Sequence, residues 1–323
     1  MKNIWHNLKK PIFILAPMDD VTDTVFRQII GDLAAPDLYF TEFTSVDGLA
    51  SEKGREPVSR RLQFTEKERP IIAQIWGNDP EKFFIAAQIC AEMGFDGIDI
   101  NMGCPEKSVV KRGMCSGLIN TPEIAVEIIK SVKAGAPNIP VSVKTRLGLR
   151  EVQPEWIKTL LNQDLAALTI HGRTVREMSK VPAHWDEIKK VVELRNEISP
   201  ETIIIGNGDV ESYEDGINKV KETGVDGIMI GRGVFKNLWI FDKSGKLHNP
   251  SVDERLSHLL KHTELFVKTW GKTKSFAILK KFFKCYISEF DGASELRAKF
   301  METKNLEEVR KLVNASVDQS PSP

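Results

Sequence analysis

Residues 96–119, DGIDINMGCPEKSVVKRGMCSGLI, decide how the rest of the chain is interpreted. Residues 97–100 form a short apolar segment that predicts a buried strand. Pro105 has no backbone N–H and a fixed φ, so the strand must end before it. Cys104 therefore lies on a loop just past the carboxyl end of a strand, which is where α/β folds place their chemistry. The other interpretation of this cysteine is a small apolar filler of the core.

Outward from this stretch, short apolar segments alternate with segments that have helical spacing. Pro80 and Pro122 suit the first turns of two of these helices, and Thr22 or Asp23 suits the N-cap of a helix over residues 24–33. About eight strand–helix units predict an α/β fold, a (β/α)8 TIM barrel. A doubly wound open sheet usually has fewer strands and an early glycine-rich phosphate turn, which this sequence lacks. The predicted strands cover residues 12–16, 38–41, 71–76, 97–100, 139–144, 166–171, 203–206 and 227–230.

A small C-terminal helical domain is predicted to follow the barrel, because residues 252–315 have the spacing of amphipathic helices. The expected division is a catalytic barrel over 1–245, a helical domain over 250–315 and a disordered tail over 316–323. Between residues 261 and 284 there are seven lysines against one acid, Glu264. A solvated helix face is the ordinary interpretation of such a charge run, and contact with a polyanion is the other.

Composition excludes several classes of protein. The 323 residues carry no net charge, and no apolar run approaches the roughly 18 residues of a membrane span. The four cysteines show no CxxC pairing and no histidine spacing suited to zinc. We therefore expect a reduced, cytoplasmic protein without a metal or a membrane anchor. A monomer is expected as well.

Polar and charged side chains follow nearly every predicted strand. In a barrel the carboxyl ends of all strands meet at one face, so these side chains are expected to converge there. Each one alone could be an ordinary solvated loop residue, but the whole set predicts an active site. Its members are Pro17, Met18, Gln74, Asn101, Lys144, Arg146, His171, Arg173, Asn207, Gly208, Asp209, Gly231 and Arg232.

The chemistry of this set favours a flavin mononucleotide. The amides of Gln74 and Asn101 can donate to and accept from the edge of a planar heterocycle. Lys144 offers a cation where a reduced ring would carry negative charge. Glycine-rich turns at 206–209 and 231–233 follow the last two strands, where barrels commonly bind a phosphate. FMN fits this combination.

The chain resembles the tRNA-dihydrouridine synthases over residues 12–241, and more loosely beyond. The resemblance implies a flavin barrel that reduces a uridine of tRNA with NADPH or NADH, and a C-terminal domain that binds the tRNA. It also implies that Cys104 is the general acid and that the residues of the set bind FMN, except Asn101, Arg146 and Arg173, which are assigned to the substrate. The motifs that carry it are Ala16-Pro17-Met18, Val21-Thr22-Asp23, Gln74, Asn101-Met102-Gly103-Cys104-Pro105, Val143-Lys144-Thr145-Arg146-Leu147-Gly148, His171-Gly172-Arg173-Thr174, Gly206-Asn207-Gly208-Asp209 and Gly231-Arg232-Gly233.

Two positions depart from the family's pattern. Asp20 stands where the family often has glycine, and Cys115-Ser116 stand where it usually has Gly-Ala. The second departure allows another thiol to lie close to Cys104.

The expected reaction follows from uracil chemistry. C6 is electrophilic and accepts a hydride, after which C5 needs a proton. A thiol such as Cys104, with an ordinary pKa of about 8.5, can supply it. Two rival functions stay open at this point: a flavin barrel enzyme that acts on a free pyrimidine, and a non-catalytic RNA-binding protein.

Overall fold

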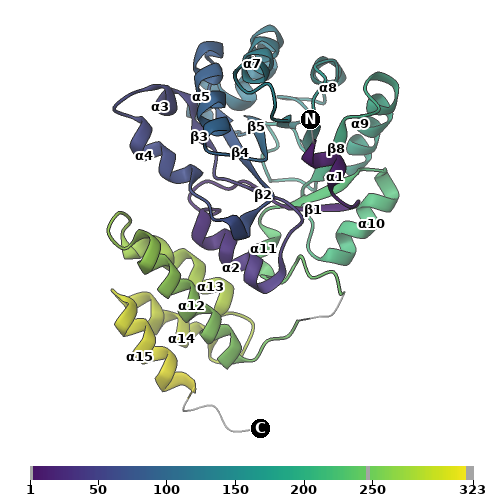
Figure 1. Cartoon of the computed structure of the whole chain (residues 1–323). Helices are drawn as coiled ribbons and strands as arrows, with labels where there is room; N and C mark the ends of the chain where they lie inside the picture. The colour runs from purple at the N-terminus through teal and green to yellow at the C-terminus, as the bar shows by residue number, and fades with distance from the viewer. Residues whose placement is uncertain (1–2, 245–247, 318–323) are drawn as a thin grey trace.

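Parallel strands form the centre of the molecule in the computed structural model, which describes residues 3–244 and 248–317 (Figure 1). They pair in the order β1-β9-β8-β7-β6-β5-β4-β2, with β3 also on β4, and a bridge between Ile14 and Leu38 joins the two ends. The predicted TIM barrel is therefore confirmed. The strands are β1 Ile12–Leu15, β2 Tyr39–Phe40, β3 Thr44–Ser45, β4 Ile71–Trp76, β5 Gly97–Met102, β6 Val141–Arg146, β7 Ala167–His171, β8 Ile203–Asn207 and β9 Gly227–Ile230.

The second barrel strand differs from its prediction, because it is split into β2 and β3. At Thr41 the hydroxyl Oγ1, and not a backbone carbonyl, accepts the N–H of Gln74 at 3.1 Å. The backbone ladder is broken there, and Glu42 turns its side chain into the structure with 2% exposure. The strand predicted over residues 38–41 corresponds to β2 and its flanking residues, and β3 was not predicted.

Helices cover the outside of the barrel, and their first turns follow the expected signals. Asp23 caps α2 by accepting the N–H groups of Val25 and Phe26, both at 3.1 Å. Pro80 and Pro122 stand at the first turns of α5 and α7. Among the helices of the described ranges, none is long and apolar enough to cross a membrane. The barrel helices are α1 Ile4–Asn7, α2 Thr24–Ala34, α3 Val46–Ala50, α4 Arg55–Ser59, η1 Arg60–Leu62, η2 Glu66–Glu68, α5 Pro80–Glu92, α6 Lys107–Lys111, η3 Cys115–Asn120, α7 Pro122–Gly135, α8 Pro154–Leu161, α9 Trp185–Ile198, α10 Tyr213–Thr223 and α11 Gly233–Lys236.

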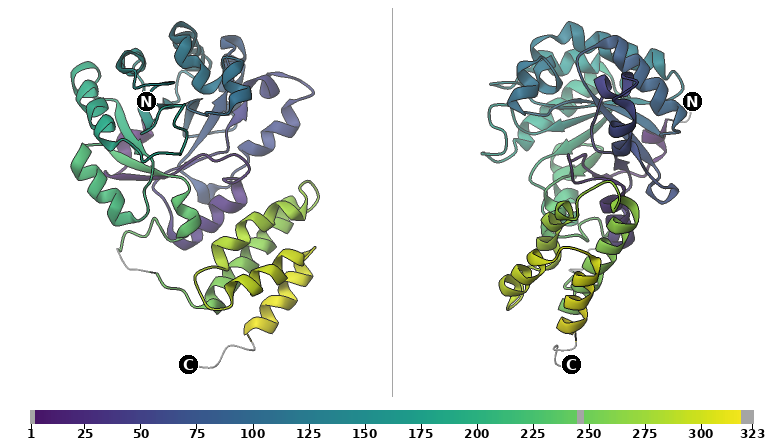
Figure 2. Two further views of the ribbon diagram at one scale, coloured as in Figure 1. Left: turned by 180° about the vertical axis from the view of Figure 1, so that it is seen from behind. Right: turned by 90° about the vertical axis from the view of Figure 1, so that its left-hand side faces the viewer.

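A separate group of C-terminal helices lies beside α2 (Figure 2). The ring of Phe282 stacks on Phe26 of α2 with 5.0 Å between centroids. The Nζ atom of Lys274 lies 2.9 Å from Asp23, and that of Lys261 lies 2.7 Å from Asp32. Apolar stacking and ion pairs thus join this group to the barrel. Its helices are α12 Val252–Trp270, η4 Phe276–Phe282, α13 Phe283–Tyr286, α14 Ala293–Glu302 and α15 Leu306–Val317.

The expected tail begins inside the last helix. α15 extends to Val317, and within it the hydroxyl of Ser316 donates to the carbonyl oxygen of Leu312 at 2.7 Å. The helix therefore continues past the boundary expected at residue 315. Residues 318–323, the rest of the predicted disordered tail, lie outside the described residues.

Candidate active site

A cavity of about 570 Å³ opens at the carboxyl ends of β1, β6, β7, β8 and β9. Most of the predicted site residues line it together, which agrees with the convergence expected for a barrel. Gln74, Asn101 and Cys104 are not among the lining residues. The sequence did not single out six residues that are: Ser179, Val210, Glu211, Met229, Ile230 and Lys236. The predicted residues that line the cavity are Pro17, Met18, Lys144, Arg146, His171, Arg173, Asn207, Gly208, Asp209, Gly231 and Arg232.

Lys144 supplies an ammonium group inside this cavity. Its Nζ donates to Oδ1 of Asn207 at 3.1 Å, and Asn207 in turn donates through Nδ2 to the carbonyl oxygen of Met229 at 2.8 Å. Burial, helped by the nearby guanidinium of Arg146, lowers the pKa of Lys144 to about 8. The group is therefore mostly cationic at neutral pH and close to losing its proton above it.

His171, Arg173 and Asp209 form a network on one wall of the cavity. Nη1 of Arg173 lies 3.1 Å from Nε2 of His171, its Nε donates to Val181, and its Nη2 donates to the Asp209 carboxylate. A guanidinium can only donate, so Nε2 of His171 must accept and its proton resides on Nδ1. Burial and the surrounding cations lower the pKa of His171, which keeps the imidazole neutral.

Arg146 connects the cavity to the loop that carries Cys104. Its Nε donates to the carbonyl oxygen of Gly103 at 2.8 Å, and its Nη1 donates to those of Thr174 and Met178 at 3.2 and 2.9 Å. Within the described residues Nη2 has no partner. The sequence assigned this arginine to the substrate, and the structure shows that it also fastens two loops at the barrel mouth.

The turn after β8 and the turn after β9 come close to other backbone and side-chain atoms. Gly208 has φ +131°, and a Cβ there would lie 2.7 Å from Ala183. A Cβ on Gly233 would lie 2.4 Å from the carbonyl oxygen of Val210. Only glycine suits either position, so both turns present bare backbone at the cavity.

The two thiols that the sequence placed near each other are in hydrogen-bond contact. The S–H of Cys115 donates to the sulfur of Cys104, which favours the Cys104 thiolate and lowers the pKa of Cys104 to about 7. The same contact, together with burial, raises the pKa of Cys115. Cys115 has φ +51°, a left-handed conformation that glycine adopts without strain. This conformation explains why the family usually has glycine here.

Gln74, Asn101 and Lys144 lie inside β4, β5 and β6, and of the three only Asn101 was expected past the end of its strand. The side chains of Gln74 and Asn101 belong to a buried row that also contains Asp99 and Ser142. Asp99, at 0% exposure, received no role from the sequence. Burial raises its pKa to about 6, while the hydrogen bonds from Ser142 and Gln74 act in the opposite direction.

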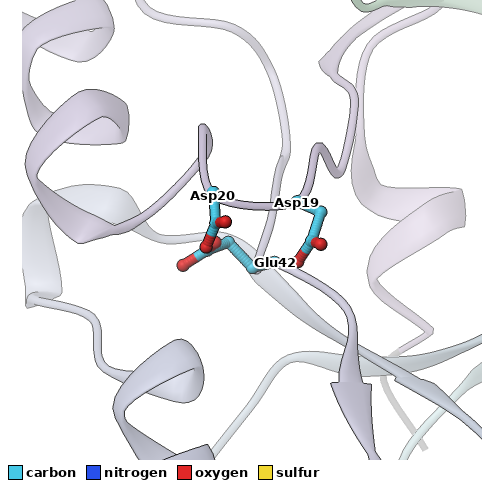
Figure 3. Close-up of side chains that lie close together, drawn as sticks. All are labelled: Asp19, Asp20 and Glu42. Atoms are coloured by element: carbon cyan, nitrogen blue, oxygen red, sulfur yellow. The ribbon is translucent and has the colours of Figure 1, made fainter. Parts of the chain in front are cut away.

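Three carboxylates gather where the β1–α2 loop meets the break between β2 and β3 (Figure 3). Asp19, Asp20 and Glu42 point toward one another, and the guanidinium of Arg61 lies among them, 3.2 Å from both Asp20 and Glu42. Burial raises the pKa of Glu42 to about 7. The arginine already supplies the positive charge for this cluster, so the geometry assigns it to ion pairing.

Comparison with known proteins decides the family. The chain matches the family described as "Dihydrouridine synthase (Dus)" over residues 14–320. The chain belongs to this family. It is 45% identical over 316 residues to a "Probable tRNA-dihydrouridine synthase" of Staphylococcus aureus (strain MRSA252), covering 97% of this chain and 95% of that protein. To "Probable tRNA-dihydrouridine synthase 2" of Bacillus subtilis (strain 168) it is 46% identical, covering 97% and 96%.

Solved structures agree with the fold of this dihydrouridine synthase family member. A morphinone reductase in complex with tetrahydroNAD superposes with a TM-score of 0.51 at 15% identity, covering 74% of this chain and 88% of that one. A 2-naphthoyl-CoA reductase in complex with 2-naphthoyl-CoA gives 0.55 at 10% identity, covering 74% and 52%. These likenesses show a shared barrel. The family match confirms the assignment made from the sequence, including the prediction of an oxidoreductase enzyme.

Proposed function

We propose that this chain reduces uridines of tRNA to 5,6-dihydrouridine, with FMN as its cofactor and NADPH or NADH as the electron donor. The observation that carries the proposal is a thiol, Cys104, held beside a cation-lined barrel cavity in a chain of the dihydrouridine synthase family. The printed names of its relatives support tRNA as the substrate.

The cavity fits a flavin mononucleotide. It offers cations to a phosphate, bare backbone at the turns of Gly208 and Gly233, and the Nδ1–H of a neutral His171 as a hydrogen-bond donor. Asp209 holds Arg173 in place, so its part in binding would be indirect. The cofactor residues assigned from the sequence, including Gln74 outside the cavity lining, are retained in this proposal.

The residues of the chain would then have separate roles in the reaction of the uracil. Bound FMN, once reduced, supplies the hydride that C6 of the uracil accepts. Cys104 would give its thiol proton to C5. The Nη2 group of Arg146 and the ammonium of Lys144 would stabilise the negative charge that develops on the uracil carbonyl oxygens. Asn101 and Arg173 are assigned to the same substrate.

The C-terminal helices would bind the tRNA outside the barrel. Lys268, Lys272 and Lys284 are exposed and form no ion pair with the described residues, so they are free to contact phosphates. The target base must leave its stack to reach the barrel, at a cost of a few kcal/mol, which a flexible RNA loop reduces. A monomeric, cytoplasmic protein stays a prediction.

Replacing the proposed acid tests this function. With tRNA that lacks dihydrouridine, Cys104→Ala is expected to slow the oxidation of reduced flavin by about 10²-fold or more, the usual scale of general acid catalysis. Flavin content and flavin reduction by NADPH should be unchanged. Cys90→Ala, a buried cysteine of α5, is the matched control. Equal rates for the parent and Cys104→Ala would reject the role of the thiol, and faster turnover of free uridine than of tRNA would favour the free-pyrimidine alternative.

A further inference from the structure

A row of buried polar side chains crosses the barrel interior from β6 to β4. Asp99, Gln74 and Ser142 have 0% exposure. The hydroxyl of Ser142 donates to Oδ1 of Asp99 at 2.6 Å, and Nε2 of Gln74 donates to Oδ2 at 2.7 Å. Oε1 of Gln74 then accepts from Nδ2 of Asn101 at 3.0 Å. Buried polar groups are expensive unless they are paired, and every link of this row is paired.

The row ends on the backbone that carries the proposed acid. Oδ1 of Asn101 accepts the N–H of Gly103 at 3.1 Å and the N–H of Cys104 at 3.0 Å. On the other side, the Gly103 carbonyl accepts from Arg146 and the Cys104 carbonyl accepts from Ser116 at 2.7 Å. The peptide groups around Cys104 are therefore held from both directions.

The direction of this chain of hydrogen bonds is fixed by its two ends. An ionised carboxylate can only accept, and a backbone N–H can only donate. The two amides between them, Gln74 and Asn101, must therefore both turn their NH2 groups toward Asp99. The carboxylate is the charged and therefore stronger acceptor of the row, so without its charge only the two backbone N–H groups would hold both amides in this direction.

We propose that Asp99 is a positioning residue for Cys104, because its carboxylate is the charged acceptor that holds the far end of the amide row that binds the Cys104 loop. Asp99 does not line the cavity and has no exposed surface, so it acts through Gln74 and Asn101. The catalytic consequence rests on the proposed function of Cys104. The positioning itself can be measured without flavin or tRNA.

The first test observes, in the full-length protein, the two backbone amides at which the row of hydrogen bonds ends. Asp99→Asn replaces the charged acceptor at the far end of the row by a neutral amide and so weakens the hold on Gln74 and Asn101, and the 1H–15N signals of the Gly103 and Cys104 amides are expected to shift and to broaden. Ser142→Ala is the matched control, because it removes the opposite partner of the same carboxylate and leaves the direction intact. Single, unshifted signals for both amides in Asp99→Asn would overturn the proposal.

The second test reverses the direction of hydrogen-bond donation along the row. Asn101→Asp places Gln74 between two carboxylates, one of which must face its carbonyl oxygen. We expect the melting temperature to fall by about 5 °C or more. Adding Asp99→Asn lets every donor turn over consistently, since the new amide at 99 donates to Gln74 and the new carboxylate at 101 accepts from Gln74 and from both backbone N–H groups. The double variant should regain at least half of the loss.

Relief of repulsion between two buried charges could produce the same recovery. Gln74→Met removes the connecting amide at similar volume, so in that background the recovery should disappear. Two results would reject the proposed row of hydrogen bonds. One is recovery of stability that persists with methionine at position 74. The other is a double variant that is no more stable than Asn101→Asp. In single-turnover assays Asp99→Asn should also slow flavin oxidation by tRNA about tenfold. A normal rate with shifted and broadened amide signals would leave the positioning correct and reject Cys104 as the acid.

Discussion

At the scale of single residues, the most informative contact is the one between Cys104 and Cys115. Proton donation by a thiol requires the protonated form, and the hydrogen bond from Cys115 favours the thiolate. The neighbour therefore narrows the pH range in which Cys104 can act. A hydrogen bond to a charged group contributes about 1.5–3 kcal/mol, which corresponds to about one to two pKa units.

Cys115→Gly should move the alkaline limb of the pH profile upward. In the parent, the protonated fraction of Cys104 falls as the pH rises through about 7. Without the donor, the pKa of Cys104 rises, and the loss of rate should shift by about one to two pH units toward higher pH. Single-turnover flavin oxidation by tRNA between pH 6 and 9 measures this, with Cys90→Ala as control. At pH 7 the rate should stay within a few-fold of the parent, and an unmoved limb would contradict the assignment of Cys115.

Sequence alone could predict the residues that end strands, but not the residues inside them. His171 and Asn207 end apolar segments, and a barrel brings such positions together whatever the details of packing. Asp99 interrupts an apolar strand, and in a sequence an isolated acid there is indistinguishable from one that faces solvent. Only the register of β4, β5 and β6 places it opposite Gln74 and Ser142.

At the scale of elements, the first helix of the barrel is tied to the insertion between β3 and β4. Arg27 of α2 and Glu68 of η2 form an ion pair at 2.8 Å with side-chain exposures of 0% and 1%. Arg27 also donates to the carbonyl oxygens of Thr22 and Gln63, and Glu68 accepts from Thr65. The split of the second strand was equally invisible in the sequence, since it depends on one hydroxyl that replaces a backbone acceptor.

Arg27→Ala is expected to lower the free energy of unfolding by about 3–5 kcal/mol, because it leaves the Glu68 carboxylate buried without its partner. Urea titration monitored by tryptophan fluorescence measures the change. Arg60→Ala is the matched control, since Arg60 forms an exposed i,i+4 pair with Glu56 at 2.9 Å. Such pairs contribute about 0.3–0.5 kcal/mol. Similar losses for the two variants would show that burial does not decide the strength of the Arg27 pair.

At the scale of the whole molecule, the lysines of residues 261–284 divide into two groups. Lys261 and Lys274 pair with acids of the β1–α2 region, and Lys281 donates to the carbonyl oxygen of Asp20. These three lysines hold the helical domain against the barrel. Lys280 donates to the carbonyl oxygen of Met301 and so joins two helices within the domain. Only the remaining three are free for a polyanion. Four lysines of the charge run therefore have a structural role that the sequence did not suggest, and contact with a polyanion stays a prediction for the other three.

The triple variant Lys268→Glu, Lys272→Glu and Lys284→Glu should weaken tRNA binding and flatten its dependence on salt. Each lost phosphate contact reduces the log–log slope by about 0.7–0.9, so three contacts should reduce it by about two to three. The matched control exchanges Lys130, Lys158 and Lys190 for glutamate. These are exposed lysines of α7, α8 and α9, which lie across the barrel from the helical domain (Figure 1). Both variants change the net charge equally, so a general loss of electrostatic attraction would affect them alike. Binding titrations from 50 to 300 mM salt distinguish local phosphate contacts from general electrostatic attraction. With local contacts, only the variant in the helical domain should have a smaller slope. With general attraction, both variants should show the same change.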